Sequence, residues 1–282
     1  MQKLPPSGGF FVVMEKESLS IAFLMAHPDD EAIPFGLPSL LSENGHKVHL
    51  ISLSDGSLGS HTLSSRRKVA RMREKEFIAA TQTLNVLPHI LGFKDGQLKP
   101  TRRMQVALLK TLRQIQPDIV LIPHKEDYHD DHVQTHEIAK WAVFHLPDKP
   151  LHTRRNLFQD IPPTKKSVAV YQVDTQGSQT WNNIAEDRGQ DTQLAPASMI
   201  IELNQIHIDK SMQSFLQHTS QLGPREGKLS YPALAVEAAS RRGRQAGFVY
   251  AVGVSQMTFG GYAFTTNNLL QKAVAPQHVF FP

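Results

Sequence analysis

Ile21-Ala22-Phe23-Leu24-Met25-Ala26 is an unbroken apolar run, and His27-Pro28-Asp29-Asp30-Glu31 follows it at once. A short continuous apolar run of this kind is typical of a strand buried on both faces. The next residues, Gly36–Asn44, favour a short helix that Gly45 ends, and Lys47–Leu53 then predicts a second strand. Strand, helix and strand in this order predict that the two strands pair in parallel.

The alternation of strand and helix continues to the middle of the chain. Its further predicted elements are a helix over Ser64–Asn85, a strand over His89–Phe93, a helix over Met104–Ile115 and a strand over Asp118–Pro123. This order predicts an α/β fold with a doubly wound, mostly parallel Rossmann-like sheet. Later segments predict a C-terminal strand and helix extension: strands over Met199–Leu203 and Phe248–Val254, helices over Ile206–His218 and Pro232–Gln245.

The composition changes between Pro147 and Pro196, where Pro, Asn, Gln, Asp and Thr are frequent and only Ser167–Val173 has a strand pattern. We interpret residues 147–196 as a variable insert in a single domain that spans residues 1–282. Loops of this kind commonly set specificity while the sheet supplies the chemistry, so we expect the insert to border the binding pocket.

The composition excludes several classes of site. The 282 residues include no cysteine, which rules out disulfide scaffolds, cysteine-ligated zinc, iron–sulfur clusters and thiol nucleophiles. Any metal must therefore bind to histidine and carboxylate. The net charge of +4 is too small to indicate a nucleic-acid or membrane partner, and we expect neither. Residues 1–20 lack a signal-peptide pattern, so we expect a cytoplasmic location.

Two loops offer both histidine and carboxylate, and each follows a predicted parallel strand. The first is His27–Glu31 and the second is His124–His132. In open parallel sheets the binding site lies outside the carboxyl ends of the strands. Two histidines and one aspartate can hold zinc with one position open for water, and a spare aspartate beside that water can act as a general base.

Other interpretations of these residues remain open. His-Pro-Asp-Asp by itself would be an ordinary turn with surface carboxylates, because proline and aspartate are favoured in turns. His132 and His136 are four residues apart and could share one helix face, but such a pair is more often found on a surface than in a ligand set. His124 could simply end its strand.

The motifs resemble those of the LmbE-like or PIG-L deacetylases, zinc-dependent enzymes that remove acetyl groups from N-acetylglucosaminyl substrates. The first signature of that family matches Ala26–Glu31, and the second matches His129-Asp130-Asp131-His132. Weaker matches follow in the family's order, at Ser54–Gly56, Arg73 with Glu76, Phe93–Gly96 and His218–Gln221. Arg242–Ala251 resembles the bacterial branch that includes bacillithiol-pathway deacetylases.

The resemblance implies a role for each matching residue. It implies one Zn²⁺ per chain held by His27, Asp30 and His132, with Asp29 as the general base. It implies that His129 stabilises the oxyanion and acts as general acid, steered by Asp131. Residues implied at the substrate pocket are Arg73, Asp95, Tyr128 and His218. Arg73 has an alternative interpretation as an i, i+3 partner of Glu76 on a solvated helix face. Bacterial relatives of this kind are often trimers or hexamers.

The expected function is therefore zinc-dependent hydrolysis of a linear amide C–N bond, which removes acetate from an N-acetylglucosamine-containing small molecule. Two alternatives stay open. One is an amidase of a different amide, such as a thiol conjugate. The other is a non-catalytic sugar- or nucleotide-binding protein, although no glycine-rich phosphate motif follows the first strand. The sequence does not identify the group attached to the sugar.

Overall fold

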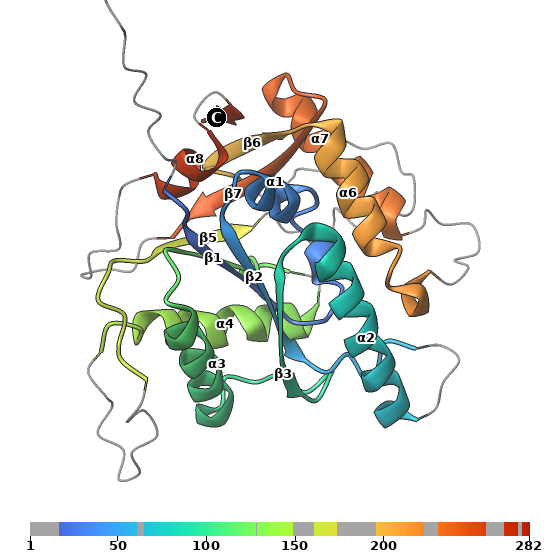
Figure 1. The fold of residues 1–282 in the computed structure, drawn as a ribbon, viewed down its shortest axis with the longest axis vertical. Helices are drawn as coiled ribbons and strands as arrows, with labels where there is room; N and C mark the ends of the chain where they lie inside the picture. Colours follow the sequence, from blue (N-terminus) through green and yellow to red (C-terminus); the bar gives the residue numbers. More distant parts are fainter. Residues whose placement is uncertain are drawn as a thin grey trace, which may run out of the picture.

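The computed structural model describes residues 17–60, 65–127, 129–148, 161–173, 196–222, 231–257, 268–275 and 278–282. Within these residues, eight strands form one sheet in the order β3-β2-β1-β4-β5-β7-β6-β8. Helices cover both faces of the sheet, as Figure 1 shows. The expected α/β class with a mostly parallel core is confirmed.

The helices and strands have the following bounds. The strands are β1 (Ser20–Met25), β2 (Lys47–Ser54), β3 (Leu87–Phe93), β4 (Ile119–Ile122), β5 (Ala169–Val173), β6 (Met199–Leu203), β7 (Tyr250–Gln256) and β8 (Val279–Phe280). The α-helices are α1 (Leu37–Glu43), α2 (Arg66–Leu84), α3 (Arg102–Ile115), α4 (Asp130–Phe144), α6 (Gln205–Phe215), α7 (Tyr231–Ala246) and α8 (Leu269–Val274). Two short 3₁₀ helices are η1 (Asp30–Ala32) and η2 (Thr219–Gln221).

The parallel part of the sheet comprises β3, β2, β1, β4 and β5. Strand β1 lies in its centre and pairs with β2 on one side and β4 on the other, with Ile21 opposite both Val48 and Ile119. The chain therefore adds β2 and β3 on one side of β1 and then crosses over to add β4 on the other side. This reversal of strand order places the loops after β1 and β4 side by side at the carboxyl edge, where ligands bind in such folds.

The antiparallel part comprises β7, β6 and β8, and β7 joins it to β5. Strand β5 lies within the segment interpreted as an insert and is the strand expected over Ser167–Val173. Most of the rest of that insert lies outside the described residues, as does Tyr128.

Two apolar cores lie on opposite faces of the sheet. One core packs α1, α2, α6, α7 and α8 against odd-numbered β1 residues such as Ile21 and Phe23. The other packs α3 and α4 against Ala22 and Leu24. Because successive residues of β1 point to opposite faces and both faces are covered, its side chains form an unbroken apolar run.

Two parts of the structure differ from the sequence-based expectation. We expected a loop through His132 and predicted no helix after it, whereas α4 spans Asp130–Phe144. His129 caps this helix by accepting a hydrogen bond from the Asp131 N–H, and Asp130 and Asp131 complement the positive end of the helix dipole. Helix α8 and strand β8 were not predicted, because elements of six and two residues are too short to show a period.

Gly36 shows why the turn before α1 needs glycine. Its φ is +88°, and a Cβ there would lie 2.9 Å from a methyl group of Leu203.

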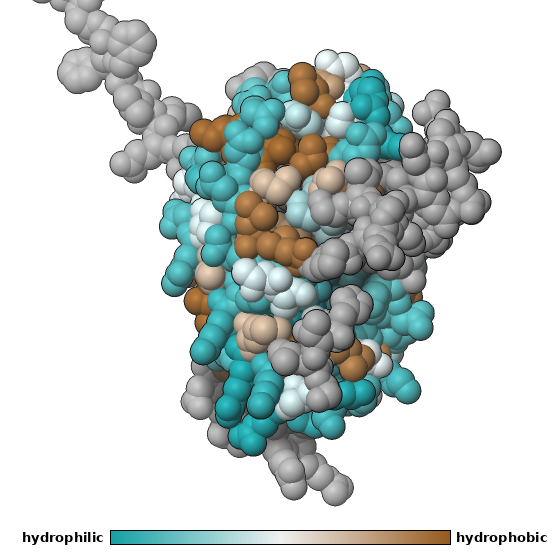
Figure 2. All heavy atoms as spheres, turned by 90° about the vertical axis from the view of Figure 1, so that its right-hand side faces the viewer, coloured by the Kyte–Doolittle hydropathy of each residue, from teal (hydrophilic) through white to brown (hydrophobic). Residues whose placement is uncertain are grey.

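Figure 2 shows the side of the molecule that α6 and α7 help to form, where apolar side chains gather mainly in the upper half. Within the described residues, no helix has the length and apolar composition that spanning a membrane requires.

Candidate metal centre and active site

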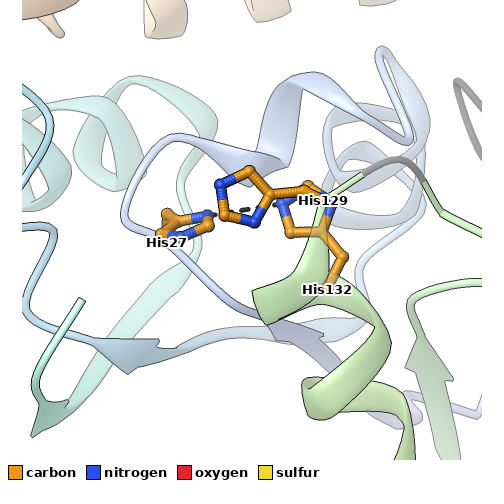
Figure 3. Close-up of side chains that lie close together, drawn as sticks. All are labelled: His27, His129 and His132. Carbon is orange, nitrogen blue, oxygen red and sulfur yellow. Dashed lines mark hydrogen bonds between the residues drawn. The ribbon is translucent and has the colours of Figure 1, made fainter. Parts of the chain in front are cut away.

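The two sequence motifs meet at the carboxyl edge of the sheet. The turn after β1 supplies His27 and Asp30, and the first turn of α4 supplies His132. His27 Nδ1 lies 3.3 Å from His132 Nε2, and the Asp30 carboxylate oxygens lie 3.5 Å from the first nitrogen and 3.3 Å from the second. Figure 3 shows the rings of His27, His129 and His132 grouped between these two elements.

This donor set fits a zinc ion. Ligand atoms 2.0–2.1 Å from a tetrahedral Zn²⁺ lie about 3.3 Å from one another, which agrees with the 3.3 Å between His27 Nδ1 and His132 Nε2. Each of these nitrogens also faces one oxygen of Asp30, Oδ2 at 3.5 Å from His27 and Oδ1 at 3.3 Å from His132. Two imidazoles and one carboxylate are also the ligand types that zinc prefers where cysteine is absent. The set leaves a fourth position for water or substrate.

The charges around the donor set favour a cation. Burial by itself would lower the pKa of His27, but the charge of Asp30 and the contacts with Asp131 and Asp95 raise it well above its usual value. Burial is likewise outweighed at His132, where Asp30 and Asp127 raise the pKa to about 10. The carboxylates therefore hold protons on both rings when nothing else balances their charge, and a metal ion would replace those protons.

Asp30 and His132 are each held by further contacts. One Asp30 oxygen accepts hydrogen bonds from the backbone N–H groups of Ala26 and His27, at 2.9 and 2.8 Å. His132 Nδ1 lies 3.1 Å from the carboxylate of Asp127, which leaves Nε2 as the atom that faces Asp30. A carboxylate on the outer nitrogen of a metal-binding histidine is a common support. Sequence reasoning missed Asp127, since nothing in the loop distinguishes it from its neighbouring carboxylates.

Asp29 forms an ion pair with Arg73. Arg73 is only 3% exposed, and the charges of Asp29 and Asp95 raise its pKa in spite of its burial. The loop after β2 approaches this guanidinium so closely that a Cβ at Gly59 would lie 1.7 Å from it. Arg73 therefore does not lie on a solvated helix face, which was the alternative interpretation, but contacts Asp29 next to the proposed ligands.

His129 lies beside both candidate histidine ligands and is half-buried. Its ring centroid is 4.6 Å from that of His27 and 4.9 Å from that of His132. Its Nδ1 accepts a hydrogen bond from the Asp131 N–H, so a neutral ring carries its proton on Nε2. Burial and the charges of His27 and His132 lower its pKa.

Asp131 and Asp95 bring two further carboxylates to the far side of His27. His27 Nε2 lies 3.3 Å from an oxygen of Asp95 and 3.4 Å from an oxygen of Asp131. The Asp131 carboxylate also accepts hydrogen bonds from the N–H groups of Gly96 and Leu98. We expected Asp131 to steer His129; its backbone N–H contacts His129, while its carboxylate lies against His27.

His218 contacts the segment that follows β1. It is fully buried, and its Nε2 lies 2.6 Å from a carboxylate oxygen of Glu31. Burial lowers the pKa of His218, but the charge of Glu31 outweighs this effect and raises it. Nearby, Glu76 accepts hydrogen bonds from the hydroxyls of Thr219 and Ser220, which fixes η2 against α2. Sequence reasoning placed His218 near the pocket but did not foresee its pairing with Glu31.

Comparison with known proteins finds a family model and a curated relative that match part of the chain. Residues 22–143 match the family model of PIG-L, described as GlcNAc-PI de-N-acetylase. A diacetylchitobiose deacetylase of Thermococcus kodakarensis is 32% identical over 105 residues, which is 34% of this chain and 38% of that protein. The resemblance expected from the motifs is confirmed. The match spans well under half the length of this curated relative.

Solved structures share the fold over most of the chain. The N,N'-diacetylchitobiose deacetylase of Pyrococcus horikoshii superimposes with a TM-score of 0.71 at 22% identity, covering 90% of both chains. GalB, a 4-carboxy-2-hydroxymuconate hydratase of Pseudomonas putida, gives a TM-score of 0.68 at 18% identity, covering 88% of this chain and 100% of that one. The fold therefore supports more than one kind of chemistry, and function must be argued from the site.

Proposed function

We propose that this chain is a zinc-dependent deacetylase of N-acetylglucosamine-containing small molecules, a proposal supported by the match of residues 22–143 to the family model of PIG-L. The observation that carries the proposal is the donor set of His27, Asp30 and His132, in which the two facing ring nitrogens lie 3.3 Å apart and each lies within 3.5 Å of one Asp30 oxygen. The sugar class rests on the relatives, which are named for the deacetylation of diacetylchitobiose.

In this proposal His27, Asp30 and His132 hold one zinc ion per chain. Such an ion would lower the pKa of a water molecule and polarise the acetamide carbonyl. The role of Asp29 is inferred from its position. It is adjacent to Asp30 in sequence, and its carboxylate forms an ion pair with Arg73. We assign it as the base that takes the proton from the attacking water.

His129 is proposed to stabilise the oxyanion and to protonate the departing amine. Its Nδ1 is occupied by the Asp131 N–H, so its Nε2 carries the proton that such a role needs. The lowered pKa of His129 favours the neutral ring, which donates from Nε2 alone.

The other predicted substrate contacts differ in how well their positions suit that role. Arg73 and Asp95 lie next to Asp29 and His27, and we propose that they border the sugar. His218 is buried on Glu31, so we propose that it positions the turn that carries Asp29 and Asp30. Tyr128 lies outside the described residues and stays a sequence-based prediction.

The test is acetate release from a panel of N-acetylglucosaminides: the free sugar, diacetylchitobiose, a malate glycoside and an inositol glycoside. Each is incubated with zinc-loaded protein and, in parallel, with chelated protein. We expect release from at least one substrate by the loaded protein alone. Zinc bound without release from any of them would favour an amidase of another amide or a different lyase or hydratase chemistry. If the protein neither binds zinc nor releases acetate, the result would favour a sugar- or nucleotide-binding protein.

A further inference from the structure

His27 presents its two ring nitrogens to two different groups of buried carboxylates. Nδ1 faces Asp30 and His132, the donor set of the proposed zinc ion. Nε2 faces the opposite way, 3.3 Å from Asp95 Oδ1 and 3.4 Å from Asp131 Oδ2. The donor atoms of His27, Asp95 and Asp131 all lie within 4.8 Å of one another.

Nε2 of His27 has no hydrogen-bond partner, although the residue is only 7% exposed and carboxylate oxygens lie close by. A buried polar atom left in this state is unusual, and each such atom calls for an explanation. Two carboxylates facing one nitrogen also exceed what its single proton can satisfy, because one N–H donates one good hydrogen bond.

The backbone holds both carboxylates in place independently of His27. Asp95 accepts a hydrogen bond from the Leu58 N–H through Oδ2, at 2.9 Å, which leaves Oδ1 directed at the ring. Asp131 accepts from the N–H groups of Gly96 and Leu98, at 2.7 and 3.2 Å. Asp95 and Asp131 are 5% and 3% exposed. This arrangement is fixed before any ligand arrives, as a metal site requires.

From this geometry we propose a second, weaker metal site formed by His27 Nε2, Asp95 and Asp131. One imidazole and two carboxylates suit zinc or copper(II) better than magnesium or calcium, which prefer oxygen ligands alone. With both sites filled, His27 would hold one ion through each ring nitrogen, and the proton on Nε2 would pass to solvent. Two cations that share His27 repel each other, so we expect the site filled second to be the weaker of the two.

The experiment counts bound metal and does not depend on catalysis. Chelated protein is dialysed against increasing Zn²⁺, and bound zinc per chain is measured by elemental analysis. We expect two classes of binding, one equivalent each, in the wild-type protein. In Asp95→Asn we expect the zinc affinity of the second class to fall. The fall should exceed the roughly 10–100-fold loss of affinity that removal of an outer-shell partner causes. The asparagine oxygen can still accept from Leu58, so the loop should keep its shape.

Asp55→Asn is the matched control. Asp55 lies in the neighbouring loop and accepts from the N–H groups of Ser57 and Asp95, so the variant removes the same charge without touching His27. It should keep both classes of binding. Asp131→Asn, checked for folding by circular dichroism, should repeat the effect of Asp95→Asn. A single equivalent at every zinc concentration, or a second class that persists in both variants, would overturn the proposal and leave the two carboxylates as acceptors for the His27 N–H.

Discussion

The parallel and antiparallel parts of the sheet contribute differently to the site. The segments that follow β1 and β4, both in the parallel part, supply the proposed metal ligands: the turn after β1 supplies His27 and Asp30, and the first turn of α4 supplies His132. The segment after β6, which belongs to the antiparallel part, supplies no proposed ligand among the residues described. It sends His218 to Glu31 and the hydroxyls of Thr219 and Ser220 to Glu76. The proposed ligands thus follow the ends of the parallel strands, and the segment after β6 holds Glu31 and Glu76 in place through hydrogen bonds.

The largest effect should come from breaking the donor set on the parallel side. We expect His132→Ala to lose bound zinc and to release no more acetate than chelated protein does, because two ligands hold zinc much more weakly than three. The measurement is metal content beside acetate release. His136→Gln is the control: His136 lies one turn further along α4 and contacts the Pro123 carbonyl. Zinc lost equally from both variants would count against His132 as a ligand.

A second variant separates the base from the metal. Asp29→Asn should keep zinc, since Asp29 is not a proposed ligand and the amide oxygen can still accept from Arg73. Its kcat should fall by about 10²–10⁴-fold, the usual contribution of a general base. Asp130→Asn, an exposed change in the first turn of α4, should leave kcat unaltered. Normal kcat in a zinc-loaded Asp29→Asn protein would refute the assignment of the base.

The ion pair between His218 and Glu31, which links the segment after β6 to the segment after β1, can be removed by substitution. We expect His218→Gln to lower the free energy of unfolding by about 3–5 kcal/mol, because it leaves the buried Glu31 carboxylate without its charged partner. Urea unfolding of His218→Gln, Glu31→Gln and the double variant measures the coupling. The double variant should be less destabilised than the sum of the single changes. Strict additivity would mean that the pair does not act as a unit.

The smallest expected effect concerns a histidine pair in the parallel part, on β2 and β3. His49 Nδ1 lies 2.9 Å from His89 Nε2, and burial with the charges of His89 and Lys47 lowers the pKa of His49 to about 4. The unfolded chain therefore binds the proton more readily, so stability is complete above about pH 6.5 and falls as the pH drops toward 4.

The pair should thus destabilise the protein in acid by on the order of 1 kcal/mol at pH 5. The check is Tm at pH 7 and pH 5 for the wild-type protein and for His49→Gln, whose amide can still hydrogen-bond to His89. The variant should lose less Tm on acidification. An equal loss in both proteins would show that other groups govern acid stability.

The same comparison explains what the sequence could and could not predict. His27 and His132 could be placed together because each follows a recognisable parallel strand, and such strands end at one edge of the sheet. The pairing of His218 with Glu31 could not be foreseen, because these residues are 187 positions apart and no local pattern joins them. Helix α4 was not predicted, and its start in particular carries no usual signal because its cap is a histidine.

Asp131 illustrates the same limit within one motif. The spacing of His129-Asp130-Asp131-His132 suggests that neighbouring residues act on one another. In the first turn of a helix, however, the backbone N–H of Asp131 points to His129, while its carboxylate lies against His27 from the other motif. Side-chain direction depends on the helix start, which the sequence did not locate.

The central claim is that the metal held by His27, Asp30 and His132 is the one that acetate release requires. The most direct test is to restore zinc stepwise to chelated protein and to measure acetate release against bound zinc per chain, using the best substrate of the panel. We predict no release without metal and a linear rise that ends at one equivalent. Release by metal-free protein, or none when one equivalent is bound to correctly folded protein, would contradict the claim.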